Sequence, residues 1–178
     1  TSNCFVFGNI IIRSAGIVVH GGKNNVVDNN IMADCRTGPV LSDGVSSRIE
    51  SWQMKGFNVG NRFLRNIIYS EKNSDEAFLF AITNHTETQV VESDRNLFFN
   101  TAGKYDIHDR DGRLSGGGDT FPLEDWQELG YEANSIITDP IFVDVEQEDY
   151  RLRPDSPAFE LGFQQIDTRR IGVRDEDS

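Results

Sequence analysis

The chain has 178 residues and a formal net charge of −12, with 37% hydrophobic and 26% charged residues. Its length and composition are those of one soluble globular domain, and its longest apolar run, near Ile10, is broken at Arg13 before it reaches membrane-spanning length. The negative charge argues against nucleic acid as a partner, because a nucleic-acid footprint needs a basic face, and it disfavours an anionic membrane.

Residue usage and repeats predict strands. Ile, Val and Phe total 40 residues, against 16 for Leu and Ala, and this balance favours pleated sheets. Four repeats each consist of an Asn followed by an apolar run, at spacings of 21, 36 and 30 residues; they begin at Asn9, Asn30, Asn66 and Asn96. Further apolar pieces flank these runs, giving about three strands per repeat. The pattern predicts a parallel β-helix, an all-β solenoid, with the four Asn side chains stacked in a hydrogen-bonded ladder.

Two insertions rich in Gly, Ser and charged residues interrupt the repeats, at 42–60 and 101–134. The second is expected to contain one short helix capped by Thr120, with Trp126 and Leu129 on its apolar face and Gly130 as its stop. After it, 135–143 has the pattern of a last strand pair.

The two cysteines are expected to be free thiols. Cys4 lies five residues before Asn9, whereas Cys35 lies five residues after Asn30. In a stack of parallel strands they therefore occupy different columns, too far apart for a disulfide.

The end of the chain carries a distinctive set of motifs. They are Asp139–Asp144, Asp149–Ala158, Leu161–Phe163, Ile166–Asp167 and Ile171–Gly172. Together with 21–31, 94–99 and the expected helix, they resemble the last coils and the closing tail, here 144–178, of bacterial right-handed parallel β-helix proteins of the pectin-lyase-like superfamily. The resemblance implies one right-handed β-helix domain over 1–178, with loop insertions and one short α-helix.

The same resemblance implies a carbohydrate-active protein, secreted or periplasmic in a bacterium, that acts on extracellular polysaccharide as a polysaccharide lyase or glycoside hydrolase. The superfamily also holds epimerases and members without activity, so a non-catalytic glycan-binding or structural module is the alternative. Such enzymes have more coils and an N-terminal cap, whereas this chain begins in a strand. We therefore expect either the C-terminal portion of a longer β-helix or a homo-oligomer formed through the uncapped first coil.

A lyase needs a base that removes the proton next to a uronate carboxylate and a cation that neutralises that carboxylate. The candidates are His20 and Lys23, in a turn with two glycines, and Arg48 or Lys55 in the first insertion. The alternative for His20 and Lys23 is an ordinary polar strand end and a solvated turn.

A glycoside hydrolase needs two carboxylates at a defined separation. Asp43 and Glu50 of the first insertion, or Asp106, Asp109 and Asp111 of the second, are candidates. Within the first insertion we expect Asp43 to be catalytic, and Glu50 and Trp52 to bind substrate, with the indole stacking on a sugar ring. Trp126, by contrast, is expected to lie in the hydrophobic core.

The segment from Asp109 to Gly112 contains Asp-x-Asp-Gly, a fragment of a calcium loop, so Asp109 and Asp111 are the candidate ligands for Ca²⁺; no other cofactor is expected. Residues 1–89 have no net charge, and the whole excess of −12 lies in 90–178. An anionic ligand or a partner chain is therefore expected on the first coils.

Overall fold

The computed structural model describes residues 2–36, 40–42, 58–72, 77–83, 85–110, 112 and 114–168. Within these residues the protein is mostly β, with parallel sheets and one short helix, as the sequence predicts. No helix among them is long and apolar enough to span a membrane.

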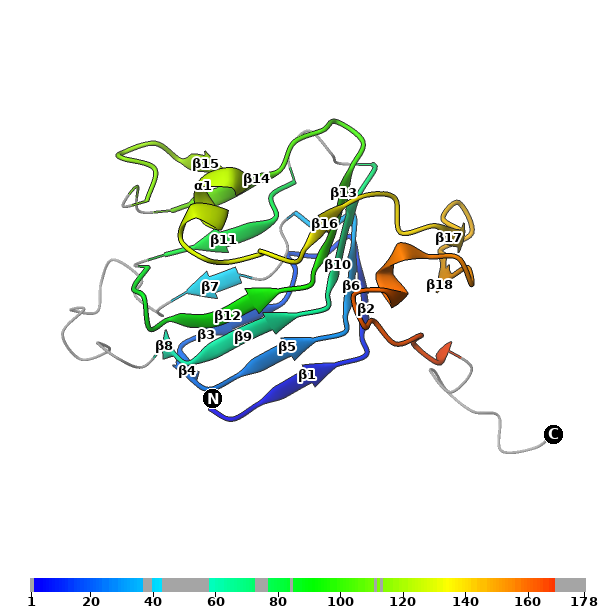
Figure 1. Ribbon diagram of the computed structural model, residues 1–178, viewed down its shortest axis with the longest axis horizontal. Helices are drawn as coiled ribbons and strands as arrows, with labels where there is room; N and C mark the ends of the chain where they lie inside the picture. Colours follow the sequence, from blue (N-terminus) through cyan, green and yellow to red (C-terminus); the bar gives the residue numbers. More distant parts are fainter. Residues whose placement is uncertain are drawn as a thin grey trace.

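Three sheets run along the molecule (Figure 1). Sheet A contains β1 (Phe5–Phe7), β5 (Val26–Asp28), β9 (Asn61–Leu64) and β12 (Val90–Asp94). Sheet B contains β2 (Ile10–Ile12), β6 (Ile31–Ala33), β10 (Ile67–Ser70), β13 (Leu97–Asn100) and β16 (Ile136–Ile137). Sheet C contains β3 (Val18–His20), β7 (Val40–Ser42), β11 (Phe80–Ile82), β14 (Asp106–Asp109) and β15 (Thr120–Pro122).

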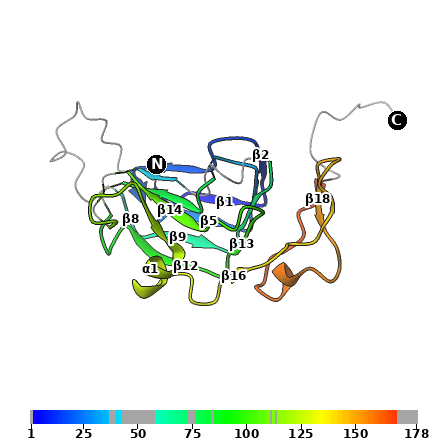
Figure 2. The same ribbon diagram turned by 90° about the horizontal axis from the view of Figure 1, so that it is seen from above.

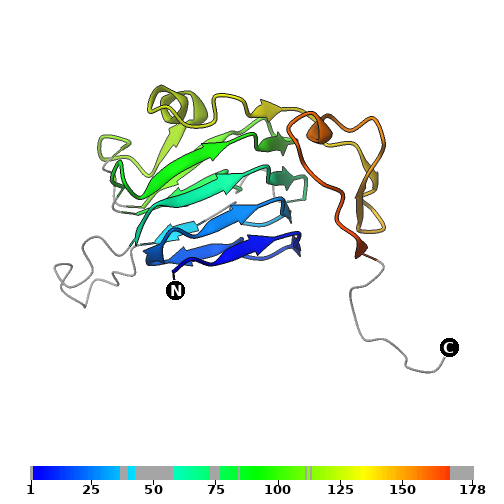
Figure 3. The same ribbon diagram turned by 60° about the horizontal axis from the view of Figure 1, so that its bottom comes forward.

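All pairs within these sheets are parallel except β14 with β15. Each pass of the chain adds one strand to each sheet, and we call such a set of three strands a rung. Rung 1 is β1–β3, rung 2 is β5–β7, rung 3 is β9–β11 and rung 4 is β12–β14, stacked in this order (Figure 3). A further parallel pair, β4 (Gly22–Lys23) with β8 (Asn58–Val59), joins the connections between rungs.

The main core lies between the three sheets and is built from side chains that alternate inward along the strands. Met32, Ile68 and Phe98 come from successive rungs of sheet B and are at most 4% exposed. Phe80 of sheet C packs edge-on against both Phe63 and Phe98. Alternation with a period of two is what allows strands this short to fill a common interior.

The helix α1 (Leu123–Glu128) covers the rung 4 end of this core (Figure 3). Trp126 is 1% exposed and stacks on Tyr131 at 4.1 Å, which confirms its expected core position. Two details of the prediction are wrong. The N-cap is Pro122, because Thr120 belongs to β15, and Leu129 is 51% exposed because the helix ends before it.

The tail forms a second layer on the outer face of sheet B (Figure 2). It contains the antiparallel hairpin of β17 (Phe142–Asp144) and β18 (Asp149–Leu152), followed by the 3₁₀ helix η2 (Pro157–Phe159). Tyr69 of sheet B meets Phe142 edge-on at 5.3 Å. The two strands expected in 135–143 are present as β16 and β17, but they do not pair with each other, since β16 joins sheet B and β17 joins the tail hairpin.

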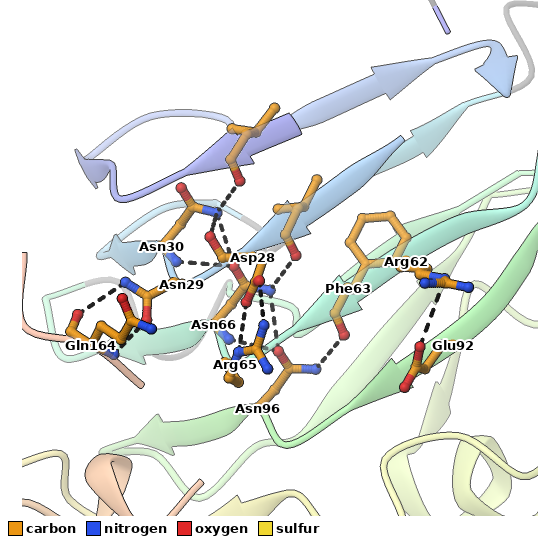
Figure 4. Close-up of polar contacts among 12 residues, drawn as sticks. Asp28, Asn29, Asn30, Arg62, Phe63, Arg65, Asn66, Glu92, Asn96 and Gln164 are labelled. Atoms are coloured by element: carbon orange, nitrogen blue, oxygen red, sulfur yellow. Dashed lines mark hydrogen bonds and ion pairs between the residues drawn. The ribbon is translucent and has the colours of Figure 1, made fainter. Parts of the chain in front are cut away.

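The predicted asparagine ladder is confirmed, and Figure 4 shows its steps from Asn30 through Asn66 to Asn96. Asn9 Nδ2 donates to Asn30 Oδ1 at 2.8 Å, Asn30 Nδ2 to Asn66 Oδ1 at 3.0 Å, and Asn66 Nδ2 to Asn96 Oδ1 at 3.2 Å. Each backbone N–H of the first three residues donates to the same oxygen as its side chain. The residue before each Asn has a positive φ, which makes the corner; these residues are Gly8, Asn29, Arg65 and Arg95.

The ladder ends on the carboxylate of Glu132, which is fully buried. Asn96 Nδ2 donates to its Oε2 at 2.9 Å, and the hydroxyls of Ser93 and Ser135 donate to its two oxygens. Burial raises the pKa of Glu132 to about 7, and the hydrogen bonds from Ser135, Ser93 and Asn96 offset only part of that rise.

A second ladder lies at the preceding corner. The N–H of Cys4 donates to Asn25 Oδ1 at 3.1 Å, and Asn25 Nδ2 donates to Asn61 Oδ1 at 3.0 Å. Cys4 thus shares a column with Asn25, whereas Cys35 lies beyond sheet B. Neither cysteine forms a disulfide bond, as predicted.

Candidate functional site

Most of the predicted site residues lie outside the described part of the chain: Asp43, Arg48, Glu50, Trp52, Lys55 and Asp111. His20 ends β3, and Lys23 lies exposed in β4. The backbone of Lys23 is fixed by rung 1, because its N–H donates to Ser2 Oγ at 3.0 Å and its carbonyl accepts from the Asn3 N–H at 2.7 Å. The described residues therefore do not bring the predicted set into one cleft.

Asp109, the described member of the expected calcium pair, is a buried residue at the end of β14. Its Oδ2 accepts from the N–H groups of Leu114 and Ser115, both at 2.8 Å, and from Ser115 Oγ at 2.9 Å. This oxygen thus anchors the loop that follows β14. Among the residues the structure describes, no group of three or more His, Cys, Asp or Glu could hold a metal ion.

The location predicted for Asp106 and Asp109 is wrong. The sequence places it in an insertion, but 106–109 is the rung 4 strand of sheet C, with Ile107 fully buried. Asp106 is half-buried on the same strand. The two carboxylates are therefore held by a strand rather than by a loop that could adapt to a sugar.

A groove of about 270 Å³ lies where the chain leaves sheet B for sheet C. We call it the cationic groove, and its lining residues are Arg13, Ser14, Asp34, Arg36 and Lys72. Its three cations come from three successive rungs: Arg13 follows β2, Arg36 follows β6 and Lys72 follows β10. All three are exposed.

Backbone pairing holds these residues in register. Arg13 and Asp34 both have a φ of 49°, so the chain bends at the same place in rungs 1 and 2. The N–H of Arg13 donates to the Ala33 carbonyl at 2.9 Å, and the N–H of Arg36 donates to the Ser14 carbonyl at 2.9 Å. The positions of the cations thus follow from the stacking of the rungs.

Asp34 lies at the floor of the cationic groove and is 3% exposed. Its Oδ1 accepts from the N–H groups of Glu71 at 2.7 Å and Lys72 at 2.8 Å. A carboxylate of rung 2 therefore fixes the backbone that carries the cation of rung 3. The carboxylate of Asp34 is thus buried and holds the backbone, whereas the exposed charged side chains that line the groove are its three cations.

The tail contacts one residue of the cationic groove, Arg13. Glu148 forms an ion pair with Arg13 at 2.6 Å, and this hydrogen bond and charge raise the pKa of Arg13. Nearby, burial and then the charges of Asp34 and Glu148 raise the pKa of Tyr150 to about 12. The phenol of Tyr150 is therefore neutral at physiological pH.

A second groove, of about 580 Å³, lies between β12 and the turn after α1. We call it the acidic groove, because Glu87, Glu92 and Asp94 are among its lining residues. Burial alone would raise the pKa of Asp94, but the hydrogen bonds from the side chain and backbone of Asn134 outweigh it and lower the pKa. The exposed side chains of Val91 and Leu129 form apolar parts of its wall.

Sequence reasoning did not identify the cationic groove, although a signal for it was present. Arg36 lies six residues after Asn30, and Lys72 lies six residues after Asn66. Aligning the repeats on their ladder Asn therefore places both cations in one column. Arg13 does not share this column, because it lies four residues after Asn9 and is in register with Asp34.

Comparisons with protein-family models, with curated proteins and with solved structures found no match to this chain. Membership of the pectin-lyase-like superfamily stays a prediction from the sequence motifs.

Proposed function

We propose that the chain folds as a right-handed parallel β-helix of the pectin-lyase-like superfamily and that it is a carbohydrate-active protein, which binds an acidic extracellular polysaccharide in the cationic groove. The repeated A, B, C order of parallel strands and the four-residue Asn ladder support the architecture. Right-handedness is the general rule for parallel crossover connections.

The main support for this function is that Arg13, Arg36 and Lys72 come from three successive rungs and line one groove. Neighbouring parallel strands lie about 4.8 Å apart, so the backbone places Arg36 and Lys72 in one column along the stack, with Arg13 two residues off that column. A polymer with a carboxylate on each sugar carries negative charge that repeats in a comparable way. A bidentate guanidinium is well suited to such a carboxylate.

The same groove supports lyase chemistry. In that reaction a cation neutralises the uronate carboxylate and a base takes the proton from the adjacent carbon. The electron pair forms a double bond and expels the glycosidic oxygen, which takes up a proton from water. We assign neutralisation to Arg13 and Arg36, because guanidinium groups stay protonated in proteins. Lys72 carries the one amine among the lining residues of the groove and is assigned as the base.

Titration of the protein with oligogalacturonate and with oligoguluronate tests the binding. Replacing Arg36 or Lys72 by Gln should weaken affinity about three- to tenfold. Arg62→Gln is the matched control, because Arg62 lies on sheet A and pairs with Glu92 at 3.7 Å. Absence of binding at low salt, or an equal loss in the control, would contradict the proposal.

Activity is measured separately, as ultraviolet absorbance of unsaturated sugar ends. Binding with product formation, abolished in Lys72→Gln, supports a lyase. Binding without product in the native chain supports the alternative of a non-catalytic glycan-binding module. Replacement of Lys72 by Arg keeps the charge but removes the amine, so it should keep binding and lose turnover.

Two observations favour other candidates. The carboxylates of the acidic groove suit a glycoside hydrolase for neutral glycans, which new reducing ends would reveal. Phe5 and Phe7 are 63% and 41% exposed on β1 and stack on each other at 5.3 Å, which suits an oligomerisation surface on rung 1. Sedimentation of the native chain and of Phe5→Ser over a range of concentrations tests that candidate.

A further inference from the structure

One cation of the cationic groove already holds a carboxylate. Arg13 Nη2 lies 2.6 Å from Glu148 Oε1, and this ion pair joins residues that are 135 positions apart in the chain. Arg13 belongs to rung 1, whereas Glu148 belongs to the tail. By contrast, no acidic side chain is paired with Arg36 or Lys72 by an ion pair within the described residues.

The hairpin turn presents Glu148 in a fixed way. It lies immediately before β18, its N–H donates to the Val145 carbonyl at 3.1 Å, and its φ is 57°. The hairpin is in turn anchored on sheet B, since Phe142 and Tyr150 pack in the second core. The carboxylate of Glu148 therefore reaches Arg13 from a hairpin that is packed on sheet B.

The pair is also accessible to solvent. The side chains of Arg13 and Glu148 are 51% and 44% exposed. An ion pair this exposed is weak, because water screens the charges, so a second carboxylate can compete for the guanidinium. The uronate carboxylate assumed in the proposed function has the same chemistry as the carboxylate of Glu148.

We infer that Arg13 is a carboxylate subsite of the cationic groove and that Glu148 occupies it as a built-in competitor, which an acidic ligand must displace. This inference rests on the proposed function. Glu148 lowers affinity for the ligand, and it favours ligands whose carboxylates can reach Arg36 in addition to Arg13. It acts on binding alone and takes no part in the bond-breaking step.

Removal of the competitor tests the inference. Glu148→Gln should bind oligogalacturonate about two- to fivefold more tightly than the native chain, the range expected from an exposed ion pair. Glu146→Gln is the matched control: it removes the same charge from the same turn, and Glu146 is exposed and forms no ion pair with Arg13. The control should change affinity less than the Glu148 variant does.

A double-mutant comparison separates local competition from general charge. In an Arg13→Gln background, Glu148→Gln should have no further effect, because the subsite is gone. Equal gains in the two turn variants, a gain that persists without Arg13, or weaker binding by Glu148→Gln would overturn the inference while leaving the proposed function intact. Failure of the native chain and of Glu148→Gln alike to bind any acidic oligosaccharide would overturn both.

Discussion

Glu132 makes a sharp prediction about the pH dependence of stability. The carboxyl is buried at the end of the Asn ladder, and its pKa is raised from 4.5 to about 7. The folded protein therefore holds a proton that the unfolded chain releases between these two values, so stability is highest on the acidic side and falls as pH rises. One pKa unit is worth about 1.4 kcal/mol, so the loss between about pH 5 and about pH 8.5 is about 2.5 kcal/mol.

Glu132→Gln keeps the shape of the side chain and removes its titration. We expect the free energy of unfolding of the native chain, relative to that of this variant, to fall by about 2.5 kcal/mol over this range. Urea denaturation at a series of pH values measures both curves, and subtracting them cancels the groups that the two proteins share. Glu128→Gln, an exposed change on α1, is the control and should follow the native curve.

Parallel curves for the native chain and Glu132→Gln would refute this reasoning. They would mean that the donors from Ser93, Ser135 and Asn96 stabilise the charged form enough to cancel the cost of burial. Such a result would change the expected charge at the end of the ladder, but it would leave the geometry of the ladder as described.

Three further predictions concern the stack itself. Asn66→Ala removes an oxygen that accepts two hydrogen bonds from Asn30, so it should lower the free energy of unfolding by about 2–4 kcal/mol in urea denaturation; a loss below 1 kcal/mol would contradict the ladder. Gly60→Ala places a Cβ 2.3 Å from the Asn24 side-chain oxygen at a φ of 74°, so thermal unfolding should show a loss of about 1–2 kcal/mol. With a thiol reagent, Cys4 should react well before Cys35, which is 3% exposed and whose pKa is raised by burial; equal rates would count against the core packing.

The features of the fold that can be predicted from the sequence are those that recur in every rung. The same corner occurs in each of the four rungs, and an Asn side chain takes part in the hydrogen bonds there each time. The repeat of Asn9, Asn30, Asn66 and Asn96 is therefore visible in the sequence alone. The β class is likewise visible in the excess of Ile, Val and Phe over Leu and Ala, since every rung needs such residues. The second ladder was equally open to detection, because Asn25 and Asn61 each lie five residues before a ladder Asn.

The remaining features depend on contacts between distant residues. Nothing near Glu148 in the chain indicates that it meets Arg13, since the tail must first dock on sheet B. The sequence predicts an insertion at 106–109 because the Asp and His residues on either side of Ile107 hide its role as a buried strand residue. The helix cap was misplaced because Thr120 has the right residue type for a cap, while the pairing of β15 with β14 uses it in a strand.

The Asn ladder also gives the molecule an electrical direction. Each side-chain amide donates one hydrogen bond toward the rung 4 end, and the last donor meets the carboxyl of Glu132. The amides of Asn30, Asn66 and Asn96 also donate back to a backbone carbonyl of the preceding rung. Aligned amide dipoles add, so the line favours negative charge at its donor end and positive charge at Asn9, as a helix does at its two ends. A short column of side chains thereby polarises the stack along its axis, although its parallel strands carry no helical backbone.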